Sequence, residues 1–298
     1  MKMKTNKIYN MDCLEGMKQL PDESVDMILC DLPYGTTCAK WDTIINLDKL
    51  WEQYKRIIKP RGAIVLTSCQ PFTSKLVMSN PEMFKYEWVW YKTDSAGFFN
   101  AKNCPVKKHE NILVFSKGTI ANCSLKLMSY NPQGLTPTRV KRKNSNRKDQ
   151  IIGERPSRKE DYIQTMTNYP VSVIYFKNDK LGIHDVSKPV ALFEYLIKTY
   201  SNEGNLVLDN CIGSGTTAVA CIQTNRNFIG YEINKEYYDI AVGRIQSAKS
   251  QTQLSNESCP NGEFNKDLEV SASPTPKSSP TEMTSPNPNI RRNLQNGS

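Results

Sequence analysis

A glycine-rich turn late in the chain restricts the possible folds most. It lies within Leu208–Ala218 (LDNCIGSGTTA), directly after the apolar residues 206–208 and before a helical pattern. Read as G-x-G-x-x-A, with Gly213 and Gly215 as its glycines, the segment lets the backbone turn tightly and approach a ligand closely. Such turns are typical of open α/β sheets, whose ligands bind at the carboxyl ends of the strands, although glycines also serve plain packing.

A carboxylate in register with this turn indicates the class of ligand. Glu232 ends the apolar run 228–231, seventeen residues after Gly215, where a carboxylate accepts the hydroxyls of a ribose. A nicotinamide-dependent dehydrogenase needs further β-α units after this point, whereas one predicted helix, near 235–248, precedes a polar tail. The remaining strands must therefore come from the front of the chain, which predicts a permuted sheet.

Apolar runs and helical periodicity place the other elements. Strands are predicted at residues 7–10, 25–30, 63–67, 112–115, 206–208 and 228–231. A helix is predicted over 47–58 and ends at Lys59-Pro60-Arg61-Gly62, and a second runs from an N-cap at Ser187, with Pro189 in its first turn, to Tyr200. Helices that alternate with strands predict a doubly wound, mostly parallel α/β sheet.

A second motif follows the strand predicted at 25–30, in the form Asp31-Leu32-Pro33-Tyr34. Pro33 fixes its own φ and restricts Leu32, so that a carboxylate, a carbonyl and an aromatic ring are held together at a strand end. These groups suit an amino group on a planar ring: the oxygens accept its N–H bonds, and the aromatic ring stacks. The same residues also suit an ordinary turn.

Positive charge is concentrated in one polar segment. The chain has a net charge of +9, and residues 139–160 carry nine basic and three acidic residues. A segment so basic, without apolar periodicity, is suited to phosphate contacts, although basic surface loops also occur in proteins that bind no DNA. The candidate contact residues are Arg139, Lys141, Arg142, Lys143, Arg147 and Lys148.

Composition excludes several classes of protein. No apolar run approaches the roughly 20 residues of a membrane span, and no secretory signal begins the chain, so we expect a cytoplasmic protein. Nine scattered cysteines and two histidines favour reduced thiols over disulfides or a metal site. Residues 250–298, rich in Ser, Thr, Asn and Pro, are expected to be disordered.

Together the two motifs resemble those of the β-group DNA amino-methyltransferases. In that family an Asp-Pro-Pro-Tyr block precedes the target-recognition region and the glycine turn comes last, as here. The resemblance covers about residues 6–249, including the strand-like segments 86–92 and 109–115. It implies the S-adenosylmethionine-dependent methyltransferase fold in circularly permuted form. It divides the chain into a catalytic half (1–117), a target-recognition insert (118–170), a cofactor-binding half (171–249) and a tail (250–298).

The resemblance also implies roles for individual residues. Asp31 and the Leu32 carbonyl would hold the target amino group, with Pro33 rigidifying the block and Tyr34 stacking on a base flipped out of double-stranded DNA. The residues implied for S-adenosylmethionine are Asp12, Lys188, Asp209, Gly213, Gly215 and Glu232. Leu32 and Asn210-Cys211 depart from the family's usual Pro and Pro-Phe. The first change removes some rigidity, and the second makes an apolar contact beside the cofactor smaller than the family's.

The predicted activity is methyl transfer to adenine N6, because cytosine-modifying relatives more often carry Ser in place of Asp31. Cytosine-N4 transfer, a non-catalytic DNA-binding relative and an enzyme acting on RNA or a small molecule are the alternatives. We expect no metal and no membrane partner. A monomer or homodimer is expected, and a companion restriction endonuclease is a possible partner.

Overall fold

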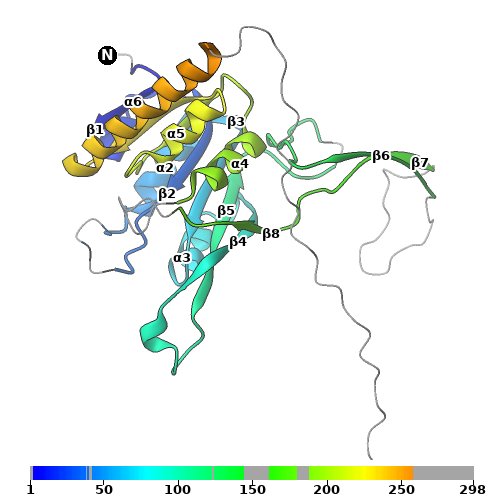
Figure 1. Ribbon diagram of the computed structural model, residues 1–298, viewed down its shortest axis with the longest axis horizontal. Coiled ribbons are helices and arrows are strands. Elements are labelled where there is room, and N and C mark those ends of the chain that lie inside the picture. Colours follow the sequence, from blue (N-terminus) through cyan, green and yellow to red (C-terminus); the bar gives the residue numbers. More distant parts are fainter. Residues whose placement is uncertain are drawn as a thin grey trace, which may run out of the picture. The chain divides into compact units, whose positions relative to one another are not determined.

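A computed structural model of the chain describes residues 3–37, 39, 42–122, 124–143, 161–179 and 188–257. Within residues 1–258, which form one compact unit, an eight-stranded sheet has the order β1-β10-β9-β2-β3-β5-β4-β8 (Figure 1). Its strands are β1 (Lys7–Asn10), β2 (Val25–Asp31), β3 (Ile58–Ser68), β4 (Phe84–Ala96), β5 (Lys107–Ser116), β8 (Val173–Phe176), β9 (Leu206–Asp209) and β10 (Asn227–Glu232).

The sheet is mainly parallel, as predicted. The neighbouring strands β1, β10, β9, β2 and β3 pair in parallel. Strand β5 pairs antiparallel with both β3 and β4, and β8 pairs in parallel with β4. The late strand β9 lies between β10 and β2, so its glycine turn comes beside the early strand that carries Asp31. This neighbourhood is what the permuted order predicts.

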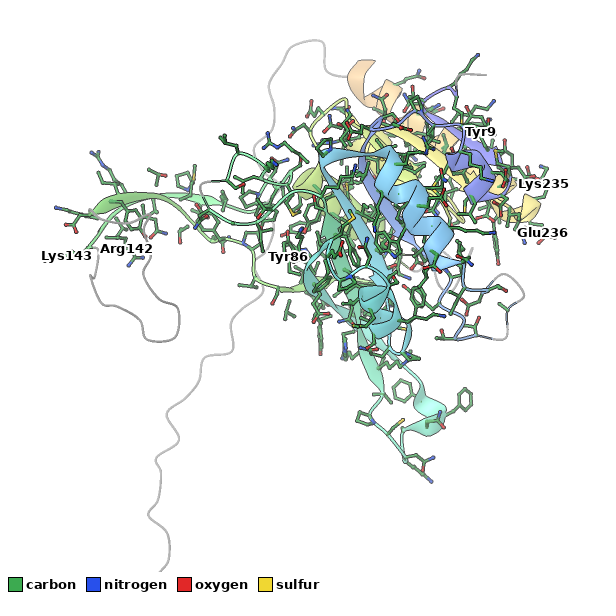
Figure 2. All side chains as sticks on the ribbon, turned by 180° about the vertical axis from the view of Figure 1, so that it is seen from behind. Tyr9, Tyr86, Arg142, Lys143, Lys235 and Glu236 are labelled. Atoms are coloured by element: carbon green, nitrogen blue, oxygen red, sulfur yellow. The ribbon has the colours of Figure 1, made fainter. Side chains whose placement is uncertain are left out.

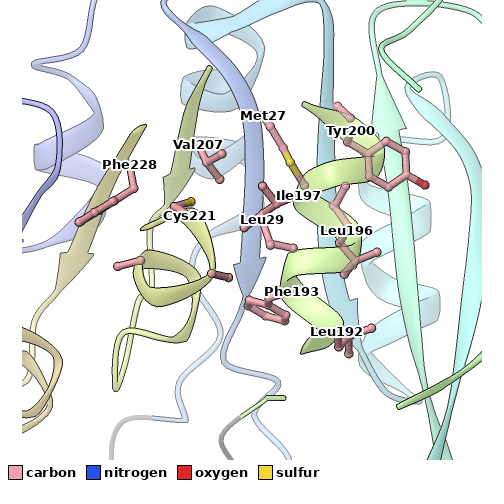
Figure 3. Packing of buried hydrophobic residues seen from close by; sticks show 14 of the residues in the cluster. Met27, Leu29, Leu192, Phe193, Leu196, Ile197, Tyr200, Val207, Cys221 and Phe228 are labelled. Atoms are coloured by element: carbon pink, nitrogen blue, oxygen red, sulfur yellow. The ribbon is translucent and has the colours of Figure 1, made fainter. Parts of the chain in front are cut away.

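Helices cover both faces of the sheet. The helices α1 (Cys13–Met17), α2 (Leu47–Ile57) and α3 (Phe72–Ser79) pack on one face. The helices α4 (Val190–Tyr200), α5 (Thr216–Gln223) and α6 (Lys235–Glu257) pack on the other. Figure 3 shows the second face, where Phe193 and Ile197 of α4 lie against Met27 and Leu29 of β2. This three-layer arrangement confirms the doubly wound fold.

Three predicted boundaries are wrong. Lys59-Pro60-Arg61-Gly62 does not separate helix from strand: β3 begins at Ile58, and the four residues bulge between its pairings with Val25 and Met27. The N-cap of α4 is Pro189, whereas Ser187 lies outside the described residues. Residues 250–257, placed in the tail by their composition, continue α6, because Ile245 and Ala248 pack onto the core and carry the helix onward.

A separate two-stranded antiparallel ribbon was not predicted. It consists of β6 (Thr136–Arg142) and β7 (Tyr162–Thr167), and it extends away from the sheet (Figure 1). The ribbon lies inside the predicted insert 118–170, and the division of the chain at residues 117 and 170 stays a prediction. No helix in the described part of the chain is long and apolar enough to cross a membrane.

Candidate active site

Asp31 ends β2 at the carboxyl edge of the sheet, and the structure shows three partners of its carboxylate. Oδ1 accepts hydrogen bonds from the Tyr34 hydroxyl at 2.6 Å and from the Thr67 hydroxyl. Oδ2 accepts one from Lys188 Nζ at 2.7 Å. The motif residues Asp31 and Tyr34 are therefore brought together as predicted, and Thr67, at the matching level of β3, joins them.

Lys188 lies in a buried network of charges. Its side chain is 8% exposed, and Nζ is 3.3 Å from Glu110 Oε2 as well as bound to Asp31. Glu110, on β5, also pairs through Oε1 with Lys92 of β4 at 2.5 Å. Burial alone would lower the pKa of Lys188, but the Asp31 and Glu110 carboxylates outweigh it, so that the pKa is raised and the ammonium stays charged.

Contacts of its hydroxyl and of its ring fix the position of Tyr34. Its hydroxyl oxygen also lies 3.0 Å from Thr67 Oγ1, and its ring stacks on Phe72 of α3 with centroids 5.5 Å apart. Lys188 Nζ lies 5.5 Å from the ring centroid. Burial, together with the negative charge of Asp31, raises the pKa of Tyr34, so its hydroxyl is a proton donor at neutral pH.

The turn after the motif is fixed by a carboxylate that the sequence analysis missed. Asp42 accepts hydrogen bonds from the backbone N–H groups of Gly35, Thr36 and Thr37 at 2.7–2.8 Å. Burial alone would raise the pKa of Asp42, but these hydrogen bonds lower it by more, so that the pKa lies below its usual value. Gly35 has a φ of +66° in this turn, which favours glycine.

The glycine turn lies next to Asp31 in space. Leu208 pairs with Ile28, so Asp209 is on the neighbouring strand, two residues before the level of Asp31. With about 4.8 Å between strands and about 3.3 Å per residue, the two Cα atoms lie roughly 8 Å apart. Asp209 accepts hydrogen bonds from the Cys211 N–H and the Thr217 hydroxyl. Burial raises the pKa of Asp209 to about 7.

The two glycines of the turn have different surroundings. At Gly213, with a φ of +51°, an added Cβ would meet nothing nearer than the Cys211 carbonyl at 4.0 Å. At Gly215, with a φ of +89°, it would lie 3.0 Å from Ala241 of α6. Gly215 therefore permits packing of α5 against α6, whereas Gly213 leaves its backbone open to close approach. Arg244 of α6 braces the turn by donating to the Ser214 carbonyl at 2.8 Å.

Glu232 and Asp12 border the turn from the next two strands. Glu232 accepts the Gly213 N–H at 2.9 Å and the Asn234 N–H at 2.7 Å, which orient its carboxylate at the mouth of the turn. Asp12 follows β1, which pairs with β10 so that Asn10 faces Glu232. It caps α1 by accepting from the Leu14 and Glu15 N–H groups. The carboxyl ends of β1, β10, β9 and β2 therefore lie at one edge of the sheet.

Asn210, which departs from the expected Pro, has partners inside the protein. Asn210 is buried, and its side-chain oxygen accepts a hydrogen bond from the Tyr54 hydroxyl of α2. Its amide is 3.4 Å from Cys211 Sγ and 3.7 Å from Cys13 Sγ. Six cysteines among the described residues are free thiols, and that part of the chain contains no group of three metal-ligating side chains.

The basic candidates lie on the ribbon and not in a loop. Arg139, Lys141 and Arg142 belong to β6, Lys143 follows directly, and all four are exposed (Figure 2). Lys141 pairs with Asp161 at 3.6 Å, and Arg142 Nε donates to Gln164 at 2.9 Å. Arg147 and Lys148 fall outside the described residues. Both faces of β6 are largely exposed, so apolar and polar residues do not alternate along it, and periodicity could not predict this strand.

The fold and the edge site define a class: an α/β protein with a glycine turn beside an acidic, aromatic strand end. The family model described as DNA methylase matches residues 25–243, and the chain belongs to this N6/N4 DNA methylase family. It is an enzyme of methyl transfer to DNA, and the family takes its methyl group from S-adenosylmethionine. The predicted family, fold and reaction class are thereby confirmed.

Individual relatives support this assignment. The chain is 30% identical over 249 residues to the type II methyltransferase M.HpaI of Haemophilus parainfluenzae, covering 79% of this chain and 73% of that protein. It is 27% identical to the DNA adenine methyltransferase YhdJ of Escherichia coli K12, with 81% and 83% covered. The solved PvuII cytosine-N4-specific DNA methyltransferase shares the fold, with 16% identity, 86% and 93% covered and a TM-score of 0.57.

Proposed function

We propose that this protein transfers a methyl group from S-adenosylmethionine to N6 of an adenine flipped out of double-stranded DNA. The observation that carries the proposal is the position of Asp31, which is paired with Lys188 and whose Cα atom lies about 8 Å from that of Asp209, the strand end from which the glycine turn begins. A methyl acceptor held by one strand end and a methyl donor held by its neighbour are then within reach of a direct transfer.

The residues of the turn fit S-adenosylmethionine. Gly213 offers open backbone, and the Glu232 carboxylate is oriented at the mouth of the turn, as a ribose contact requires. Asp12, Asp209 and Gly215 complete this side, the last by shaping the turn. When bound there, S-adenosylmethionine supplies an electrophilic methyl group on a sulfonium sulfur. Lys188, which donates to Asp31 at 2.7 Å, would be the residue that contacts the carboxylate of this ligand.

The hydrogen bonds of Asp31 show how it would hold an amino group. A carboxylate has about four acceptor sites, and Asp31 uses three of them, two on Oδ1 and one on Oδ2. The remaining site on Oδ2 accepts one N–H of the target amine, and the Leu32 carbonyl accepts the other. This pairing favours a pyramidal nitrogen whose lone pair points at the methyl group. In the transfer the N–C bond would form as the bond between the sulfonium sulfur and the methyl group breaks, which would leave S-adenosylhomocysteine, and Asp31 would receive the proton that leaves nitrogen.

Positioning would supply most of the acceleration. An exocyclic amine is a poor nucleophile because its lone pair is delocalised into the ring, and orientation of reacting groups is worth up to about 7–11 kcal/mol. Tyr34, backed by Phe72 at a centroid distance of 5.5 Å, would stack on the flipped base. Pro33 holds the turn between Leu32 and Tyr34, and the base leaves the duplex at a cost of a few kcal/mol.

The β6–β7 ribbon is proposed as the DNA-binding and target-reading element. A two-stranded β-ribbon fits the major groove of B-form DNA, and Arg139, Lys141, Arg142 and Lys143 are exposed on this one. We extend the proposal to Arg147 and Lys148, which continue the basic run in sequence. Neutralised phosphates release counterions, so DNA binding through this ribbon depends steeply on salt.

A methyl-transfer assay with labelled S-adenosylmethionine and unmethylated duplex DNA tests the proposal. Wild-type protein should label DNA, and hydrolysis of the DNA should release N6-methyladenine. Asp31→Ala should abolish transfer while calorimetry still detects cofactor binding, and Asp48→Ala, an exposed aspartate at the start of α2, should remain active. Near-normal turnover by the Asp31 variant would refute the role of this carboxylate.

Cytosine N4 is the second candidate target, favoured by the shared fold of the PvuII enzyme, which is cytosine-N4-specific. Release of N4-methylcytosine in the same assay would establish it. Adenine is favoured by the Asp at the head of the motif and by the similarity to the adenine methyltransferase YhdJ. We further propose a cytoplasmic monomer or homodimer with a companion endonuclease of the same specificity, because M.HpaI is described as a type II methyltransferase.

A further inference from the structure

The hairpin between β4 and β5 extends well beyond the active-site edge and ends in two unpacked aromatic rings. Its end carries the short 3₁₀ helix η1 (Phe98–Asn100), and Figure 1 shows the hairpin projecting past the rest of the sheet. Phe98 is 68% exposed and Phe99 fully exposed at 105%. Every residue from Ala96 to Pro105 is exposed, so nothing in the described part of the protein covers these rings.

The register of the sheet places this end on the same side as Asp31. Asp31 pairs with Thr67, Thr67 with Ile112, and Ile112 with Trp88, so Trp88 of β4 is level with the catalytic carboxylate. β4 runs parallel to β2 and continues for eight more residues, to Ala96. At about 3.3 Å per residue, the end of the hairpin lies roughly 25 Å beyond Asp31.

The charges of the hairpin identify a polyanionic partner. From Ser95 to Lys108 the chain has three lysines, Lys102, Lys107 and Lys108, and no acidic residue. Lys107 is exposed, and Lys108 Nζ lies 5.3 Å from the centroid of the Tyr91 ring. Asn100 and Asn103 add exposed amides beside η1. Rings at the tip and cations along the sides are the groups that a DNA duplex receives from proteins that insert apolar side chains between base steps.

We propose that Phe98 and Phe99 form a wedge that enters the base stack near the target and stabilises the duplex with the target base flipped out. The inference rests on the proposed function, because it requires a base to leave the duplex and occupy the site at Asp31. Flipping costs a few kcal/mol of lost pairing and stacking, and an inserted ring offsets part of the lost stacking. The hairpin is thus a second DNA contact, distinct from the β6–β7 ribbon.

The double variant Phe98→Ala/Phe99→Ala tests the wedge, because both side chains are exposed and their loss leaves the core unchanged. Methyl transfer is measured on two versions of a duplex that wild-type protein methylates, one fully paired and one with an abasic position opposite the target. We expect a loss of at least 10-fold on the paired duplex and activity within about 3-fold of wild type on the opened one. Met78→Ala, which removes a 72% exposed side chain from α3, is the matched control.

A direct readout of flipping completes the test. With 2-aminopurine at the target position, wild-type protein should raise the fluorescence of the duplex, and the double variant should raise it far less. Phe98→Leu/Phe99→Leu, which keeps apolar bulk, should restore much of both signals. Equal activity of the double variant on the paired duplex, or equal losses on the two duplexes, would overturn the wedge.

Two further outcomes are separable from these. Sedimentation that shows a wild-type dimer and a monomeric double variant, with unchanged flipping, would assign the rings to an interface between copies and overturn the inference. Wild-type protein that transfers no methyl group to any DNA would overturn the proposed function itself, whereas an active wild type with an unaffected double variant overturns the wedge alone.

Discussion

Asp31 and Asp209 end neighbouring strands of one sheet, yet their surroundings differ. Asp31 is paired with the ammonium of Lys188 at 2.7 Å and keeps 30% of its side chain exposed. Asp209 is 3% exposed, and its described partners are the neutral Thr217 hydroxyl and a backbone N–H. A carboxylate that is buried without a cation resists ionisation, and burial raises the pKa of Asp209. The role of a carboxylate at a strand end therefore depends on the charges beside that carboxylate and not on its position alone.

The largest expected effect concerns Asp209, whose raised pKa makes stability depend on pH. The unfolded chain releases the proton near the usual value of 3.8, and the folded chain releases it near 7. Between these values the folded state holds more protons, so this group's contribution to stability is complete below about pH 4 and is lost as the pH rises through 7. At about 1.4 kcal/mol per pKa unit, the loss is about 4 kcal/mol.

Asp209→Asn removes this titration. Urea denaturation of both proteins at pH 5 and pH 8 should show the variant gaining stability relative to wild type as the pH rises. An identical difference at the two values would mean that Asp209 is ionised throughout, and the contrast with Asp31 would disappear. Asp22→Asn, an aspartate whose side chain is 73% exposed, is the matched control and should change the pH dependence little.

The next prediction removes the cation from Asp31. Lys188→Met keeps much of the buried aliphatic volume and removes the cation from Asp31, whereas Glu110 keeps its pair with Lys92. We expect kcat to fall about 100-fold, or about 2.7 kcal/mol in activation free energy.

The single-turnover rate at saturating cofactor separates this role from a simple cofactor contact. Lys188→Arg should lose only part of the rate, because the guanidinium restores the charge with a different shape. If Lys188→Met weakens cofactor affinity without lowering the rate at saturating cofactor, Lys188 serves the methionine end of the ligand and not Asp31.

The same contrast explains what sequence patterns predict and what they miss. The strand ends that carry Asp31 and Asp209 are local features, set by an apolar run and a turn, and both were predicted. Glu110 was missed because it reaches Lys188 across 78 positions of sequence, and no local pattern marks such a pairing. Its strand was expected, but the side chain gave no separate signal.

Other differences have the same origin in packing that is distant in sequence. Pro60 and Gly62 are typical of a break, yet pairing of β3 with β2 and β5 carries the strand past them through a bulge. The β6–β7 ribbon is missed for the opposite reason. Exposed on both faces, β6 has no apolar alternation, and its partner β7 begins 20 residues after β6 ends.

The smallest expected effect tests how far the buried network extends from Asp31. Glu110 pairs with Lys188 through Oε2 and with Lys92 through Oε1, while Lys188 also pairs with Asp31. Glu110→Gln keeps the shape and an acceptor but removes a negative charge, so Lys188 turns its full charge to Asp31. The rate should fall by about 3-fold or less, since Lys188 retains its direct bond of 2.7 Å to Asp31. The single-turnover rate of this variant is compared with those of wild type and Lys188→Met. A loss as large as that of the lysine variant would mean that Glu110 positions Lys188 and that the charge pair at Asp31 does not stand alone.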